Sequence, residues 1–194
     1  MRIRRRLPIG IQSFVEIRRG GYYYVDKTRF VLKLAEEGKY YFLSRPRRFG
    51  KSLFLDTLKQ AFLGRRELFE GLYLERNWDW SRSYPVIHID FAGGVVSDEE
   101  DLRRWFLYQM KLNYQELGID LVYDDPRISF SELVIRAYHR YKTQVVVLVD
   151  EYDKPILDRI DDADKSIKIR EELRNIYSVL KPLDEYLRFV FITG

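Results

Sequence analysis

The chain has 194 residues, of which 46% are hydrophobic and 15% aromatic, a composition that excludes a disordered protein and provides for one substantial core. It contains no cysteine and two histidines, which excludes disulfides and thiol catalysis and leaves oxygen ligands for any bound metal. No apolar run approaches the roughly 18 residues of a membrane helix, so the sequence predicts a cytoplasmic protein without membrane contact. The net charge of +4 is modest and does not by itself indicate nucleic-acid binding.

The first half of the chain predicts helices and strands in alternation. The sequence shows no repeat, low-complexity tract or linker, so we expect one domain over residues 1–194, with a lead-in at 1–38 and a nucleotide-binding core at 39–194. In order, we expect an extended aromatic run at 22–25, a helix capped by Asp26 or Thr28 and ending near Gly38, a strand at 40–43, and a helix that follows residue 50 and ends near Gly64. The aromatic segment 69–80 has no clear pattern.

The second half continues the alternation. It predicts a strand at 85–91, a helix from Ser97 or Asp98, a helix at about 131–141, a strand at 145–149, a helix that ends before Pro182, and a strand at 187–192. The strand at 145–149 is apolar at every position, as is typical of a central strand in a parallel sheet covered on both faces. The chain is therefore expected to form an α/β fold, a three-layer αβα sandwich with a mostly parallel sheet.

The segment Ser44–Ser52 ends in Gly-Lys-Ser, the end of a phosphate loop (Walker A motif). In such a loop, backbone amides at a helix N-terminus surround phosphates, and here they would come from Arg47, Arg48, Phe49, Gly50, Lys51 and Ser52. Lys51 would place its charge on the β- and γ-phosphates of ATP, and the Ser52 hydroxyl would bind Mg²⁺. The general pattern has glycine where this chain has Arg45, and a Gly-Lys-Ser turn at an ordinary strand–helix junction is the alternative.

Two acids follow the apolar strand at 145–149. Asp150 would hold Mg²⁺ in the manner of a Walker B acid, and Glu151 would polarise the water that attacks the γ-phosphate. The alternative is an acidic pair that solvates a strand end or caps a helix. Asp153 and Lys154 follow closely, and either orient Glu151 or pair with each other. The two motifs together predict a P-loop NTPase sandwich.

Thr193 ends the last predicted strand. P-loop enzymes of the additional-strand, catalytic-glutamate division place a polar residue there to position water or to sense the γ-phosphate, so Thr193 is a candidate catalytic residue. The chain ends at Gly194, one strand short of the five-stranded core of that division. We therefore expect a fragment that is truncated before its last core strand.

Several motifs together resemble those of the AAA-ATPase-like family of bacterial and archaeal proteins. They cover essentially the whole chain and lie at 7–14, 24–28, 41–52, 68–72, 84–88, 150–155 and 191–194. Members share an arginine at the position of Arg45, so the resemblance favours a phosphate loop despite the missing glycine. The family is similar to archaeal ATPases and signal-transduction ATPases.

The resemblance implies ATP binding and slow, switch-like hydrolysis coupled to a partner domain. Many members carry a C-terminal nuclease-like domain of the PD-(D/E)XK type, which is missing from these residues. In related ATPases an acidic and a basic residue before the first strand lie near the base, which makes Asp26 and Lys27 candidate contacts to adenine. Helix capping and surface pairing are the alternative for both residues.

Three hypotheses for the function remain open at this stage. The first is a Mg²⁺-dependent ATPase, and the second is a module that binds ATP without turnover and signals its presence to a partner. The third is a nucleic-acid-associated defence or mobile-element protein, suggested by the basic run at 2–6 and by the nuclease fusions, although a solvated tail is the favoured interpretation of that run. The sequence carries no indication of an oligomeric state.

Overall fold

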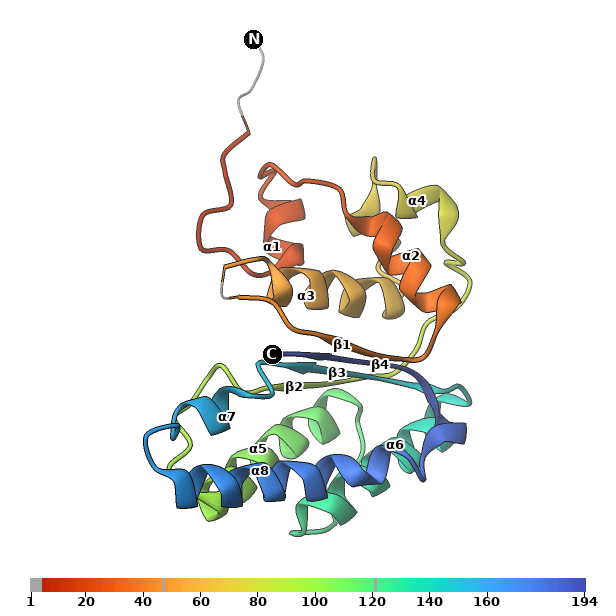
Figure 1. Ribbon diagram of the computed structural model, residues 1–194. Coiled ribbons are helices and arrows are strands. Elements are labelled where there is room, and N and C mark those ends of the chain that lie inside the picture. The colour runs from red at the N-terminus through yellow and green to blue at the C-terminus, as the bar shows by residue number, and fades with distance from the viewer. Residues whose placement is uncertain (1–4, 47, 121) are drawn as a thin grey trace.

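The computed structural model describes residues 5–46, 48–120 and 122–194. Its centre is a four-stranded sheet in the order β1-β4-β3-β2, in which every neighbouring pair is parallel (Figure 1). The strands are β1 (Tyr40–Leu43), β2 (Val86–Asp90), β3 (Val145–Asp150) and β4 (Leu187–Thr193). The prediction of an α/β fold with a parallel sheet is confirmed.

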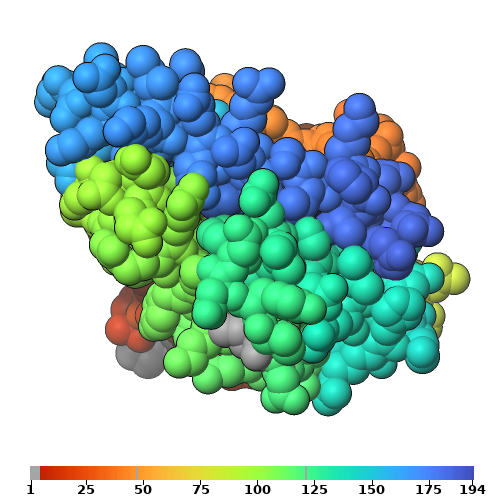
Figure 2. All heavy atoms as spheres, turned by 90° about the horizontal axis from the view of Figure 1, so that it is seen from below, coloured from red at the N-terminus to blue at the C-terminus, as the bar shows by residue number. Residues whose placement is uncertain are grey.

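Helices cover both faces of this sheet. They are α1 (Phe14–Arg19), α2 (Thr28–Glu37), α3 (Lys51–Phe62), α4 (Leu74–Asn77), α5 (Glu99–Glu116), α6 (Pro126–Tyr141), α7 (Lys154–Leu157) and α8 (Ala163–Tyr177), with 3₁₀ turns η1 (Arg66–Phe69), η2 (Ser178–Leu180) and η3 (Asp184–Tyr186). Figure 1 shows α1 to α4 on one face and α5 to α8 on the other, and Figure 2 shows α5, α6 and α8 from below. No helix in the described ranges is long and apolar enough to span a membrane.

The sheet separates two apolar cores, and β3 contributes to both. Val145, Val147 and Val149 face the core under α5, α6 and α8. Val146 and Leu148 face the core that also contains Phe14 of α1, Val31 of α2 and Leu58 of α3. All six residues of β3 are buried, which explains why the strand lacks polar alternation.

The strand register brings the predicted site motifs to the carboxyl end of the sheet. Leu43 of β1 pairs with Thr193 of β4, and Asp90 of β2 pairs with Asp150 of β3. Because all strands are parallel, their carboxyl ends lie at the same end of the sheet. The loop after β1 and the acids after β3 therefore lie at that end (Figure 1).

Local signals account for the elements that differ from expectation. Helix α6 begins at Pro126 and not near 131, because the Asp125 carboxylate accepts hydrogen bonds from the N–H groups of the first turn and proline suits that position. Helix α1 was not expected, although Ser13 caps it by accepting from the Glu16 N–H. The unassigned segment 69–80 contains α4 and the end of η1. Residues 22–25 lie outside the sheet.

Candidate functional site

The loop between β1 and α3 has the backbone of an anion-binding turn. Arg48 and Gly50 both adopt left-handed conformations, with φ of 69° and 78°. Gly50 is the residue before α3, and its carbonyl accepts the first helical hydrogen bond from the Phe54 N–H at 3.0 Å. Such a turn directs successive N–H groups toward one concave surface. Arg47, which we expected to supply one of these amides, lies outside the described residues.

The N-terminus of α3 has no side-chain cap. In contrast, aspartate carboxylates accept hydrogen bonds from the first turns of α5, α6 and α8. The first N–H groups of a helix have no partner inside the helix, so those of α3 are of the kind that binds an anion, and the helix dipole adds a favourable potential. This arrangement fits the phosphates that the loop sequence predicts.

Lys51 and Ser52 occupy the first turn of α3. The Lys51 ammonium donates to the Arg45 carbonyl oxygen at 2.5 Å, so its side chain folds back over the loop. The same helix contains one acidic residue, Asp56. Its carboxylate accepts hydrogen bonds from the Phe14 N–H at 2.6 Å and from the Gln60 side-chain amide. Asp56 thus anchors α1 to α3 and does not neutralise the basic loop.

On the acidic side, Asp150 ends β3 with 5% of its surface exposed. Its Oδ1 accepts a hydrogen bond from the Glu151 N–H at 3.1 Å and another from the Thr193 hydroxyl. The side-chain hydrogen bonds that Asp150 accepts from the described residues both reach Oδ1. Together with the Ser52 hydroxyl, the Asp150 carboxylate offers oxygen ligands of the kind that Mg²⁺ prefers. No cluster of three or more histidine, aspartate or glutamate ligands occurs in the described part of the chain.

Glu151 has a left-handed backbone, with φ of 50°. This conformation is costly for a residue with a side chain and commonly marks a functional position. Here the Glu151 N–H is held by Asp150 and, at 3.3 Å, by the Thr193 hydroxyl oxygen. Two buried groups, the Asp150 carboxylate and the Thr193 hydroxyl, therefore hold the backbone from which the Glu151 side chain extends.

Thr193 is fully buried and connects the two halves of the site. Its hydroxyl contacts Asp150 and Glu151, and its carbonyl accepts from the Tyr152 N–H at 2.9 Å. The next residue, Gly194, accepts from the Arg45 N–H at 3.2 Å. The end of β4 thus touches both the loop after β1 and the acids after β3.

A small cavity of about 230 Å³ lies where these segments meet. Arg45, Pro46 and Lys51 line it from the loop, and Glu151, Asp153 and Lys154 line it from the turn after β3. Lys154 donates at 2.6 Å to both Asp158 and the Gly94 carbonyl, so it does not pair with Asp153. The tertiary structure thus brings Lys51 and Glu151, 100 positions apart, to one cavity.

The exposed residue Asp26 forms several hydrogen bonds through its carboxylate. Its Oδ1 accepts from the N–H and hydroxyl of Thr28, and its Oδ2 accepts from the Tyr73 N–H at 2.7 Å. Burial raises the pKa of the Asp26 carboxyl, but these donors outweigh burial and hold the pKa below its usual range. The observed contacts of Asp26 are therefore those of a helix cap that joins α2 to α4.

We predict that Asp26→Asn lowers the free energy of unfolding by about 0.5–2 kcal/mol at neutral pH, because one backbone donor loses its carboxylate. The folded-state pKa is depressed, so the ionised carboxylate stabilises the fold above about pH 4, and this contribution is lost as pH falls further. Urea unfolding between pH 3 and 6 should show the difference between wild type and variant shrink with acid. A difference that stays constant with pH, or appears equally in the exposed-residue control Glu36→Gln, would contradict this role.

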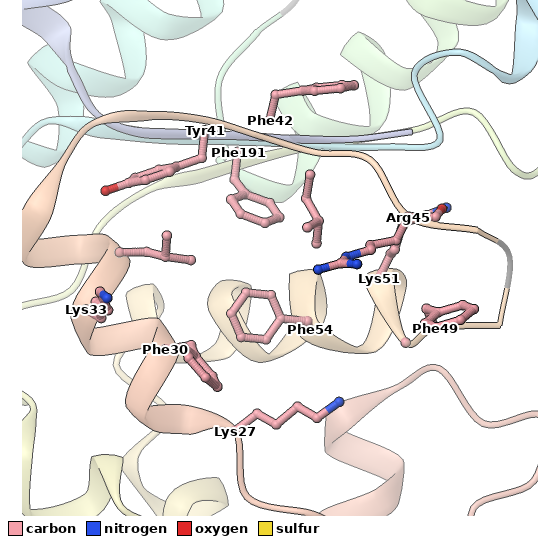
Figure 3. A pocket seen from close by; sticks show the side chains of 13 residues that line it. Lys27, Phe30, Lys33, Tyr41, Phe42, Arg45, Phe49, Lys51, Phe54 and Phe191 are labelled. Carbon is pink, nitrogen blue, oxygen red and sulfur yellow. The ribbon is translucent and has the colours of Figure 1, made fainter.

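A larger cavity of about 580 Å³, which we call the edge cavity, adjoins the loop at the β1 edge of the sheet (Figure 3). Its walls come from α2, β1, α3 and β4, and Gly50 and Lys51 line the end nearest the loop. Lys27 lies at its lower border in Figure 3, whereas Phe42 points to the opposite side of the sheet, where it packs edge-on against Tyr152. Sequence reasoning identified Lys27, Phe49, Gly50 and Lys51 among the lining residues. It assigned no site role to Phe30, Phe54 and Phe191, since no local pattern separates them from ordinary core positions.

The sheet is parallel and has helices on both faces, and a Gly-Lys-Ser motif stands at the start of α3. These features are consistent with the P-loop NTPase class. The family model described as "Predicted AAA-ATPase" matches residues 8–194, and the chain belongs to this family. The chain is also similar to an uncharacterized protein from the vnfD 5′ region of Azotobacter chroococcum mcd 1, with 52% identity over 192 residues. That match covers 98% of this chain and 37% of the relative, and no solved structure matches the chain.

Proposed function

We propose that this chain is a Mg²⁺-dependent ATP-binding and ATP-hydrolysing module. The observation that carries the proposal is the cavity that Lys51 and Glu151 share, beside a helix N-terminus without a side-chain cap. The amides of residues 48–52, together with that of Arg47, would bind the β- and γ-phosphates, and Lys51 would leave the Arg45 carbonyl to pair with them. Family membership supports nucleotide binding independently.

The residues present fit Mg²⁺, because Ser52 and Asp150 offer a hydroxyl and a carboxylate oxygen of the kind this ion takes. When bound, the ion would neutralise charge on the phosphates. Glu151 would accept a proton from the water that attacks the γ-phosphate in line with the leaving oxygen. Thr193 would act as a positioning residue, since its hydroxyl holds both the Asp150 carboxylate and the Glu151 backbone.

Asp26 and Lys27 would have different parts on the base side of the site. The Asp26 carboxylate would set the start of α2, and Lys27 at the border of the edge cavity would contact the nucleotide. The module would serve as a switch for a partner domain. The greater length of the Azotobacter relative supports a partner region of this kind.

The experiment that tests the proposal is the melting temperature with and without Mg²⁺-ATP, for wild type and Lys51→Ala. A ligand at about 100 times its dissociation constant stabilises the fold by roughly 2.7 kcal/mol, which is about 5 to 10 °C for a domain of this size. We expect this shift in wild type, none in Lys51→Ala, and a retained shift in Lys59→Ala, which changes a lysine two turns further along α3. A folded wild type whose melting temperature is unaffected by Mg²⁺-ATP would refute the proposal.

A further inference from the structure

The edge cavity has an apolar, largely aromatic wall. The residues that form it are Phe30, Leu34, Tyr41, Leu43, Phe54 and Phe191. Figure 3 shows Phe191 pointing from the sheet toward Phe54 of α3, Tyr41 pointing from the sheet toward α2, and Phe30 of α2 near Phe54. Phe30 retains 41% of its surface exposed, with the Arg29 guanidinium 4.7 Å from the centre of its ring. A flat apolar ligand would remove that surface from water.

The edge cavity adjoins the predicted phosphate loop, because Gly50 and Lys51 of that motif are among its lining residues. Its volume of about 580 Å³ lies in the range of sites that enclose small ligands. A nucleotide whose phosphates lie on the loop would therefore extend its ribose and base into this space. Stacking on aromatic rings is a general way to hold a base, and it works for every base because each has a π-face.

The polar groups of the edge cavity decide how far it can distinguish one base from another. Among the described lining residues, the charged side chains are all cations: Lys27, Lys33, Arg45 and Lys51. No carboxylate or side-chain amide lines the cavity within the described ranges, and the Tyr41 hydroxyl is the one neutral polar side-chain group there. Strong discrimination needs donors and acceptors matched to the edge of one base, whereas an apolar pocket discriminates weakly.

We propose that the edge cavity holds the base of a nucleoside triphosphate by aromatic stacking and accepts adenine and guanine almost equally. This inference rests on the proposed function, because it needs the phosphates on the loop. It adds a substrate class, nucleoside triphosphates that are not limited to ATP, and a base-binding wall that contains Phe30.

A second cavity of about 280 Å³ provides the structural alternative. It shares Lys27, Gly50 and Phe54 with the edge cavity, but its remaining wall comes from the lead-in, including Leu7 and Tyr23. It is about half the size of the edge cavity and has one charged residue, Lys27, among its described lining. Tyr23 is 55% exposed, so its truncation is a matched control for that of Phe30.

The test is calorimetric binding of Mg²⁺-ATP, Mg²⁺-GTP and Mg²⁺-tripolyphosphate to wild type, Phe30→Ala and Tyr23→Ala. Tripolyphosphate probes the loop without a base. We expect ATP and GTP to bind wild type within about tenfold of each other and both more tightly than tripolyphosphate. Phe30→Ala should weaken ATP and GTP alike by about 5- to 100-fold, the range of one lost stacking contact, and leave tripolyphosphate binding unchanged. Unchanged melting temperatures without ligand verify that both variants fold.

Each other result overturns the inference in a distinguishable way. If tripolyphosphate binds as tightly as the nucleotides, the loop site stands but the edge cavity holds no base. If ATP exceeds GTP by more than about 100-fold, the cavity reads the base edge and does not merely stack it. If Tyr23→Ala weakens the nucleotides and Phe30→Ala does not, the base lies in the smaller cavity. If none of the three ligands binds wild type, the proposed function fails together with the inference.

Discussion

Replacing Glu151 with glutamine is expected to reduce ATP turnover by at least about 100-fold while Mg²⁺-ATP still raises the melting temperature. Glutamine has nearly the same shape as glutamate but cannot accept the proton of the attacking water. Both residues meet the same left-handed backbone at this position, where φ is 50°, so the free energy of unfolding should change little. Phosphate release measured beside the ligand-induced melting shift separates loss of chemistry from loss of binding.

Asp153→Asn is the matched control for this change, because Asp153 lines the same small cavity two residues further along the chain. We expect this variant to retain most of the turnover. A large loss in Asp153→Asn with normal turnover in Glu151→Gln would assign the base to Asp153. Equal turnover in wild type and both variants would exclude either acid as the base, and binding without turnover in wild type would favour the module that holds ATP as a signal.

Replacing Thr193 with valine is expected to destabilise the unliganded protein by about 1–3 kcal/mol. The Thr193 hydroxyl donates to the Asp150 carboxylate, which is 5% exposed, and also accepts from the Glu151 N–H. Valine keeps the shape but removes the donor, so a buried carboxylate loses one of its two partners. For a domain of this size, thermal unfolding should show a fall of roughly 2 to 12 °C.

The control for this change is Thr193→Ser, which keeps the hydroxyl and loses one methyl group. We expect serine to retain most of the stability and turnover, and valine to lose turnover as well, because Glu151 would no longer be held in place. Equal melting temperatures for the valine and serine variants would show that the hydroxyl contributes nothing to stability. Equal turnover in both would remove Thr193 from the positioning of Glu151.

The contacts of Thr193 also suggest how nucleotide binding would reach the rest of the domain. One residue after Thr193, the backbone contacts Arg45 of the phosphate loop, and α7 starts three residues after Glu151. Lys154 of α7 in turn contacts the loop after β2 through the Gly94 carbonyl. A continuous set of hydrogen bonds therefore runs from the loop after β1 to the loop after β2.

Much of the fold could be predicted because its signals are local. The strand at 40–43 was expected with the bounds that β1 has, and the apolar run at 145–149 needs only one more residue to become β3. Such patterns follow from burial: a strand between two helical layers must be apolar on both sides. The predicted start of α6 was wrong by five residues. Asp125 and Pro126 form a helix start, but later positions in this segment also suit one, and the sequence alone does not choose between them.

Other features depend on partners that are far away in the chain. Asp26 was expected either to contact adenine or to cap a helix, and in the structure its Oδ2 accepts from the Tyr73 N–H, 47 positions away. The edge cavity has a wall built from α2, β1, α3 and β4, and a ring such as that of Phe30 looks like any other apolar position of an amphipathic helix. No pattern within one element reveals a space between four elements.

The sequence by itself determined the class of fold, because its apolar strands alternate with helices. It also predicted a phosphate loop and an acidic pair at a strand end, from residue types in a characteristic order. The tertiary structure decided which of these groups meet. It placed Lys51 and Glu151 at one cavity and brought the Thr193 hydroxyl within hydrogen-bonding distance of the Asp150 carboxylate. It also placed Asp26 where its carboxylate links the start of α2 to the start of α4. The reason is physical: a motif specifies chemistry through its residue types, whereas distance, burial and hydrogen-bond partners arise only when the strands pair in the order β1-β4-β3-β2.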